Sequence, residues 1–209
     1  DSPRTDVNEA GDGILDGSED FDGDGLNNTV EQRIGTNPYA PDTDSDGLTD
    51  WYEYQYDGLD PLVADSDGDG VIDGEGDPDG EGLINVQEQA AGTDPFDSDT
   101  DGDRLTDFFE VNRSQTSPLS GDSNSTGTTI NESADGVPDA LEDHDNDSLT
   151  NIQEQQFGTD PLAADSDSDG VSDSYELNVT LTNPLDADSD SEVTDANEAD
   201  DGVPDGKGG

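Results

Sequence analysis

Cysteine and methionine are absent from the 209 residues, lysine occurs once, and five basic residues face 57 aspartates and glutamates. Without cysteine no disulfide can stabilise the chain, and the redox compartment cannot be inferred. His144 is the only histidine, at what we expect to be an outward position between acids. Carboxylate pairs are abundant, but each belongs to one of the loops described below and none has the pattern of an acid–base pair, so we expect no enzyme. There is no hydrophobic run long enough to span a bilayer and no signal peptide, so we expect no membrane insertion of this segment. Since residue 1 is not methionine, we expect a processed product or an excerpt of a longer chain.

Large apolar side chains are also scarce. Leucine, isoleucine, valine and phenylalanine together number 36, and the formal net charge is −52. This combination is typical of a disordered chain, so we expect disorder without metal and folding with it. Near-absence of lysine beside so many acids is typical of proteins exposed to molar salt, which predicts a halophilic source. The charge argues against nucleic acid and anionic membranes as partners.

The acids are nevertheless ordered, because nine segments place acids or Asn at alternate positions, followed usually by a glycine, an aliphatic residue and a final glutamate. In one of them positions 1, 3, 5, 6 and 12 are Asp20, Asp22, Asp24, Gly25 and Glu31. This spacing surrounds one Ca²⁺ with side chains from 1, 3 and 5, a backbone carbonyl from 7, often a water at 9, and a bidentate Glu from 12. Glycine at 6 permits the sharp turn that this requires. The sequence therefore predicts calcium as the cofactor, with about nine bound ions.

The predicted ligands occupy the alternate positions of these loops and the start of a further one. They are Asn8, Asp12, Asp16, Glu19, Asp20, Asp22, Asp24, Asn28, Glu31, Asp42, Asp44, Asp46, Asp50, Glu53, Asp65, Asp67, Asp69, Asp73, Asp77, Asp79, Glu81, Asn85, Glu88, Asp99, Asp101, Asp103, Asp107, Glu110, Asn131, Asp135, Asp139, Glu142, Asp143, Asp145, Asp147, Asn151, Glu154, Asp165, Asp167, Asp169, Asp173, Glu176, Asp201 and Asp205. We expect weaker binding where the pattern is broken. The breaks are Gly76 in place of the final Glu, Arg104 and Ser148 in place of the turn glycine, and Asn8 and Asn131 as neutral first ligands.

The loops recur in groups of three. Within each group the second loop begins directly after the first loop ends. Four marker glycines show the period, at Gly13, Gly70, Gly136 and Gly202. The second and third of their intervals are equal, and each is nine residues longer than the first. This periodicity predicts a tandem array of modules at 1–64, 65–130 and 131–196, with an incomplete fourth at 197–209. The stretch 120–130, rich in Ser, Thr, Gly and Asn, is the best candidate for a flexible or variable segment.

Short helices are expected after the loops, because apolar residues recur three or four positions apart, as in Leu26, Val30 and Ile34. Glycines suited to a helix C-cap follow three of them, at Gly35, Gly92 and Gly158. The predicted fold class is an irregular, calcium-stabilised tandem repeat with little or no sheet, forming an elongated rod. We expect small cores that include Trp51, Tyr52, Phe108, Phe109, Phe157 and Tyr175.

A calcium sensor is not predicted, because an EF-hand needs a helix entering each loop as well as one leaving it. Glu19 directly precedes Asp20, and only three residues separate Pro38 from Asp42, so no entering helix fits. The Met-rich groove of a sensor is missing as well. Dockerins also lack the entering helix, but they use a single pair of loops.

The arrangement resembles thrombospondin type 3 repeats, above all the bacterial and archaeal form, in which Gly-Thr-Asp-Pro follows the loop. Residues 20–38, 77–95 and 143–161 follow that form closely, and the resemblance covers nearly the whole chain. It implies calcium-stabilised, rod-like structure in secreted or cell-surface proteins, often as a spacer or adhesive stalk. Animal members carry disulfides, which this chain lacks.

Three functions remain open from the sequence. The first is a calcium-binding spacer or stalk of an extracellular protein. The second is a filament subunit or adhesin, in which the last loop is completed by the next copy, head to tail. The third, an acidic mimic of nucleic acid, would not require the observed spacing. Six glycosylation sequons give mild support for a surface glycoprotein, at Asn27, Asn112, Asn124, Asn131, Asn146 and Asn178.

Overall fold

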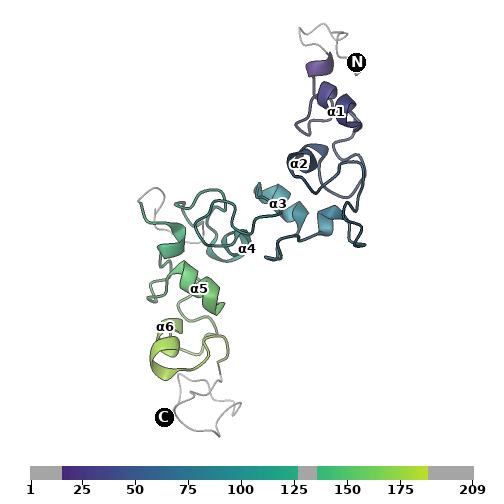
Figure 1. Cartoon of the computed structure of the whole chain (residues 1–209). Coiled ribbons are helices and arrows are strands. Elements are labelled where there is room, and N and C mark those ends of the chain that lie inside the picture. The colour runs from purple at the N-terminus through teal and green to yellow at the C-terminus, as the bar shows by residue number, and fades with distance from the viewer. Residues whose placement is uncertain (1–15, 127–135, 188–209) are drawn as a thin grey trace. The chain divides into compact units, whose positions relative to one another are not determined.

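The computed structural model describes residues 16–126 and 136–187, and the chain divides into two compact units, Asp1–Phe96 and Asp97–Gly209 (Figure 1). The first unit contains η1 (Asp16–Ser18), α1 (Asn28–Ile34), α2 (Asp50–Gln55), η2 (Asp73–Glu75) and α3 (Asn85–Ala91). The second contains α4 (Asp107–Phe109), η3 (Glu110–Ser114), η4 (Asp139–Leu141), α5 (Asn151–Phe157), α6 (Asp173–Tyr175) and η5 (Glu176–Thr180). Of these, η1, η2 and η4 are 3₁₀ turns, whereas η3 and η5 are π-helical.

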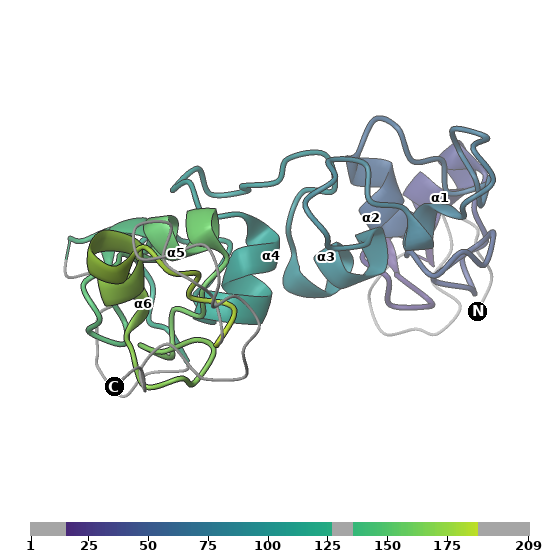
Figure 2. The same ribbon diagram turned by 90° about the horizontal axis from the view of Figure 1, so that it is seen from below.

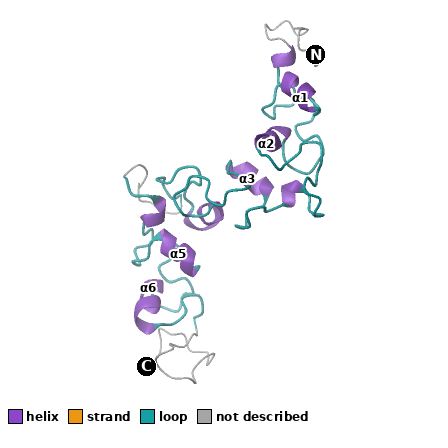
Figure 3. Cartoon of the chain, viewed as in Figure 1, coloured by secondary structure: helices purple, strands orange, loops and turns teal. Residues whose placement is uncertain are grey.

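Strands are absent from the described residues, where Asp57 and Leu59 form one isolated bridge (Figure 3). The predicted class of short helices in an otherwise irregular chain is therefore confirmed. Helices that leave two abutting loops lie side by side in the cases of α1 with η1, α3 with η2, and α5 with η4 (Figures 1 and 2). The rod and the module boundaries remain predictions from the sequence.

Every helix that leaves a loop begins at position 9 of that loop. The residue before it is extended, as at Asn27 with φ −89° and ψ 156°, and serves as the N-cap. The N–H of position 9 donates to the carbonyl of the residue before position 1, as from Asn28 to Glu19 at 2.8 Å. This bond closes the loop and places position 12 in the first helical turn, from which Glu31 faces back into the loop.

The ends of the helices depend on the residues that come after them. Gly35, Gly92 and Gly158 have φ of 99°, 85° and 82°, and their N–H groups donate to the carbonyls of the position 12 glutamates, which confirms the predicted C-caps. The turns η1, η2 and η4 stop after three residues, because the next loop starts almost immediately.

The apolar core is small and built around position 7. Leu48, Leu83 and Leu105 are no more than 1% exposed, whereas Val71 and Val137 are about two-fifths exposed, in the loops that precede η2 and η4. The aromatic expectation is only partly right: Tyr52 and Phe109 are buried, but three others are about two-fifths to half exposed, namely Trp51, Phe157 and Tyr175. Helices of one or two turns present too few positions to cover such large side chains.

Candidate calcium-binding loops

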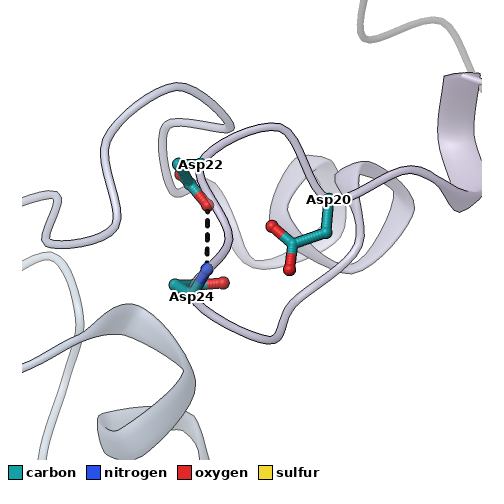
Figure 4. A group of neighbouring side chains, drawn as sticks. All are labelled: Asp20, Asp22 and Asp24. Atoms are coloured by element: carbon teal, nitrogen blue, oxygen red, sulfur yellow. Dashed lines mark hydrogen bonds between the residues drawn. The ribbon is translucent and has the colours of Figure 1, made fainter.

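The loop that begins at Asp20 is shaped by hydrogen bonds from its own backbone N–H groups to its aspartate side chains. Asp20 accepts hydrogen bonds from the N–H of Gly23 at 2.7 Å and of Gly25 at 3.1 Å, one on each oxygen. Asp22 Oδ1 accepts from the N–H of Asp24 at 3.3 Å. Oxygens of the three aspartates lie within 4.8 Å of one another, and Figure 4 shows the side chains around the space that the loop encloses. Backbone N–H groups thus fix the aspartate side chains, and oxygens of all three lie close together.

The same bonds recur along the chain. The N–H of position 6 donates to Oδ2 of position 1 at 2.9–3.1 Å in the loops that begin at Asp20, Asp42, Asp65, Asp99, Asp143 and Asp165. Arg104 and Ser148 occupy position 6 in two of these loops with φ of 94° and 86°, so a non-glycine residue adopts the left-handed turn there. Further groups of close carboxylates are Asp42, Asp44 and Asp46, then Asp65, Asp67 and Asp69, then Asp99, Asp101 and Asp103.

Positions 3 and 12 are the ones that most often present buried oxygens that accept no hydrogen bond. At position 3 the second oxygen is in this state in Asp22, Asp44, Asp101, Asp145 and Asp167. At position 12 both oxygens of Glu31 and Glu53 are in this state, and one oxygen of Glu110, Glu154 and Glu176. These five glutamates are at most 1% exposed. Buried carboxylate oxygens are normally hydrogen-bonded, protonated or coordinated to a metal, so these oxygens are candidate ligands for a cation.

The pKa values of these acids point the same way. Burial, and then the charges of Asp44 and Asp46, raise the pKa of Glu53 from its ordinary 4.5 to about 9. The pKa values of Glu110 and Glu154 are likewise raised to about 9, mainly by burial and next by the position 3 aspartates of their own loops. Without a cation these carboxylates therefore favour the protonated form, which a calcium ligand cannot have.

Threonine hydroxyls hold several position 12 glutamates, a role that the spacing of the acids did not predict. Thr116 Oγ1 donates to Glu110 Oε1 at 3.1 Å, and Thr182 Oγ1 donates to Glu176 Oε1 at 3.0 Å. Thr159, from a Gly-Thr-Asp-Pro segment, makes the corresponding but longer contact with its own glutamate at 3.5 Å. A threonine five or six residues after the glutamate was the available signal in these loops, although Thr36, at the same spacing from Glu31, makes no such bond.

Position 9 supports the loop through hydrogen bonds of its own. Asp50 accepts from Thr43, the position 2 residue, through N–H at 2.8 Å and Oγ1 at 2.7 Å. The same pair of bonds joins Asp73 with Ser66, and three other loops repeat it at Asp107, Asp139 and Asp173. Their predicted service as ligands, directly or through water, remains a prediction.

In three described loops position 2 has no hydroxyl, and there position 9 is asparagine; the first of these has Phe21 and Asn28. Asn85 and Asn151 follow Pro78 and His144 at position 2, and each amide donates at 2.7 Å to the position 9 carbonyl of the abutting loop. The choice between Asp and Asn at this position is therefore explained by the neighbour that it must bind.

Position 5 connects several loops to the next loop within a unit. The second oxygen of Asp24 accepts from the N–H of Trp51 at 3.0 Å, and that of Asp46 accepts from Gly74 at 3.1 Å. In the second unit Asp147 accepts from Ser174 at 2.8 Å. In all of these the donor is position 10 of the following loop. Asp46 and Glu53 also approach Asp73 of the next loop within 4.8 Å. Neighbouring loops therefore share charge as well as hydrogen bonds.

The loop 65–76 lacks the buried glutamate of the others. Gly76 occupies position 12, Glu75 is exposed on η2, and none of the buried oxygens without a hydrogen bond belongs to this fully described stretch. These features agree with the expectation of weaker binding at 65–76.

The expected outward position of His144 is wrong. Its side chain is buried, and Nε2 lies 2.8 Å from Glu142 Oε2. It lies between Asn151 of its own loop and Glu142 of the abutting loop.

Several predicted ligands lie outside the described residues or have no described side chain. They are Asn8, Asp12, Asp16, Asn131, Asp135, Asp201 and Asp205. The other ligands predicted in loops 77–88, 143–154 and 165–176 lie in the same local arrangement, with the N–H of position 5 donating to position 3 at 3.0–3.2 Å in each.

Among the described residues no helix has both the length and the apolar character needed to cross a membrane.

Comparisons with known proteins bear on the resemblance to thrombospondin type 3 repeats. The curated proteins and the solved structures gave no match. A model described as "Bacterial TSP3 repeat" matches residues 20–41 and 165–187, one segment in each unit. These two segments are thus similar to bacterial thrombospondin type 3 repeats, in agreement with the resemblance expected from the sequence.

Proposed function

We propose that the chain is a calcium-dependent structural segment, in which bound ions take the place of a large apolar core. The observation that carries this proposal is the burial of the five position 12 glutamates named above, each 1% exposed or less. They lie among aspartates, and each has at least one oxygen that accepts no hydrogen bond. The family of the two matched segments has the same role, since TSP3 repeats are structural calcium-binding units. Catalysis forms no part of the proposal.

The donor set fits calcium better than a transition metal or magnesium. All candidate ligands are oxygens, with no histidine at a ligand position and no cysteine in the chain. Glu53 belongs to a twelve-residue loop whose spacing supplies more than six oxygens, which suits the larger and more flexible shell of calcium. When bound, the ion supplies positive charge where position 3 and position 12 carboxylates converge.

The protein residues shape the site around the ion. Asp42 and Asp44 accept hydrogen bonds from the backbone of the first half of their loop. Glu53 lies in the first turn of α2, and Asp46 accepts a hydrogen bond from the next loop. Closing one loop therefore fixes the start of a helix and orients the next loop. A segment built in this way acts as a spacer whose order depends on calcium.

We further propose that the segment is extracellular and comes from a halophile, at the surface of a cell or secreted. TSP3 repeats are typically extracellular, where calcium is plentiful. The net charge of −52 and the single lysine support the halophilic source. Glycosylation and head-to-tail assembly remain predictions, and light scattering against calcium concentration tests the second.

Counting ions tests the proposal directly. Native mass spectrometry and calcium titration of the full chain should give about nine ions, with the weakest sites in the range of extracellular modules, about 10⁻⁴ to 10⁻³ M. Magnesium at the same concentration is the control, and it should leave the helical signal unformed. Fewer than about five calcium ions would show that charge had been mistaken for coordination.

A further inference from the structure

The hydrogen bonds around Gly136 identify a loop that the simple spacing hides. Gly136 is position 6, since Asp139 is position 9 and Glu142 is position 12. In six other loops the N–H of position 6 donates to Oδ2 of an aspartate five residues earlier. The N–H of Gly136 instead donates to Oδ2 of Asp122, fourteen residues earlier, at 3.0 Å. Asp122 thus makes the bond that a position 1 aspartate makes elsewhere.

Two further bonds require the same numbering. Asp139 accepts from the N–H and Oγ of Ser123 at 2.8 and 2.7 Å, as Asp73 accepts from its position 2 residue Ser66 at 2.9 and 2.6 Å. The N–H of Asp139 donates to the carbonyl of Gly121 at 3.1 Å, the bond that position 9 makes to the residue before position 1. Ser123 is therefore position 2, and Gly121 precedes the loop.

The intervals between loops agree, and they are independent of the hydrogen bonds. The interval from Asp99 to Asp122 equals the interval from Asp42 to Asp65, whereas Asn131 lies nine residues too far along the chain. Counted from Asp122, the loop that ends at position 12 is nine residues longer than the usual twelve. Nine residues is also the difference between the shorter and the longer interval of the marker glycines.

We propose that residues 122–142 form one calcium loop interrupted by a nine-residue insertion, with Asp122 rather than Asn131 as the position 1 ligand. This assignment rests on the proposed calcium-binding function. The insertion leaves the loop at once, because Ser125 Oγ donates to the carbonyl of Ser114 and the N–H of Thr126 donates to that of Gln115 at 2.9 Å. Lengthening a loop by nine residues adds little closure entropy, so the two halves can still meet.

The same rule extends to the next loop of the array by sequence alone. Asp188 lies as far after Asp165 as Asp122 lies after Asp99. Asp188 also precedes Asp201 by the same number of residues by which Asp122 precedes Asp135, the position 5 residue of its loop. The inserted segment is therefore a repeated feature of this array, and the stretch that seemed a linker is part of a loop.

Deleting Ser125 to Ser133 from the full chain is the decisive test, because it joins Asn124 to Ala134 and leaves an uninterrupted twelve-residue loop. We expect the deletion variant to bind as many calcium ions as the wild type by native mass spectrometry. Asp122→Ala should lose one ion, or weaken one site at least tenfold in calcium titration. Asn131→Ala, the matched control, should change neither the count nor the affinity.

Each outcome bears on the assignment. If the deletion or Asn131→Ala loses an ion, while Asp122→Ala binds like the wild type, the loop begins at Asn131 and the insertion does not exist. If Asp122→Ala fails to fold, the deletion variant still decides, because it removes Asn131 and keeps Asp122. A wild-type chain that binds no calcium would refute the proposed function instead, and Glu176→Gln in a distant loop would then have no effect on titration.

Discussion

Removal of calcium at pH 7 should unfold the chain, and the cause should be the buried glutamates. The metal-free fold raises the pKa of Glu53, Glu110 and Glu154 to about 9, from 4.5. Keeping one such group protonated at pH 7 costs about 3 kcal/mol, since each pH unit above the unfolded pKa costs about 1.4 kcal/mol. Three of them cost about 10 kcal/mol, as much as the whole stability of an ordinary domain.

The sign of the pH dependence follows from the direction of these shifts. A carboxyl whose pKa is raised by folding favours the metal-free fold below pH 4.5, and this contribution is lost as the pH rises from 4.5 to 9. Calcium binding needs the ionised carboxylates, so affinity for calcium should instead fall as the pH drops below neutrality. The metal-free and calcium-bound forms therefore have opposite pH trends.

Far-UV circular dichroism and hydrogen exchange, on protein freed of metal by dialysis, test this between pH 4 and 9. Adding 2 M KCl separates the causes, because salt screens exposed charges but leaves the burial of Glu53, the largest cause of its raised pKa, in place. Backbone protection that survives metal removal at pH 7 would refute the reasoning. Recovery of protection by KCl alone would show that surface repulsion, rather than burial, opposes folding.

Three substitutions test other parts of the structure. Glu176→Gln should weaken one site at least tenfold in calcium titration and leave hydrogen exchange in residues 16–96 unchanged, because stability in repeat arrays depends on near neighbours. Thr116→Val removes the hydroxyl that donates to Glu110, and should destabilise the calcium-loaded protein by about 1–2 kcal/mol in thermal unfolding, whereas Thr116→Ser should not. Gly76→Glu supplies the missing position 12 carboxylate and should raise the affinity of its loop about tenfold, or about 1.4 kcal/mol, and an unchanged titration would contradict that placement.

Local features were the predictable part of this fold. The sequence was enough to place helices after the loops and C-caps at Gly35, Gly92 and Gly158, because the loop closure and the glycine act within a few residues. The candidate ligands at positions 1, 3, 5 and 12 followed from spacing alone, and in four described loops the carboxylates of positions 1, 3 and 5 lie within 4.8 Å of one another. That they bind calcium remains a prediction.

Features that depend on a neighbouring loop were not predictable in the same way. The burial of His144 and the contact of Asp24 with the next loop both arise from packing between loops. Asp122 escaped notice because a fixed twelve-residue window cannot contain a ligand separated by an insertion. A comparison of intervals along the array would have found it, since Asp99 and Asp122 keep the spacing of the corresponding aspartates in the first module.

The composition of the core explains why fold and ligand cannot be separated here. Among its largest fully buried side chains are three leucines, Leu48, Leu83 and Leu105, beside six glutamates of position 12. Burying one leucine stabilises a protein by about 2 kcal/mol, which does not offset the cost of one buried glutamate at pH 7. A bound cation turns the cost of burying the glutamates into a stabilising contribution, because the same carboxylates then become ligands. If the proposed function holds, the buried carboxylates oppose folding without metal, and the folded state is then a direct response to calcium.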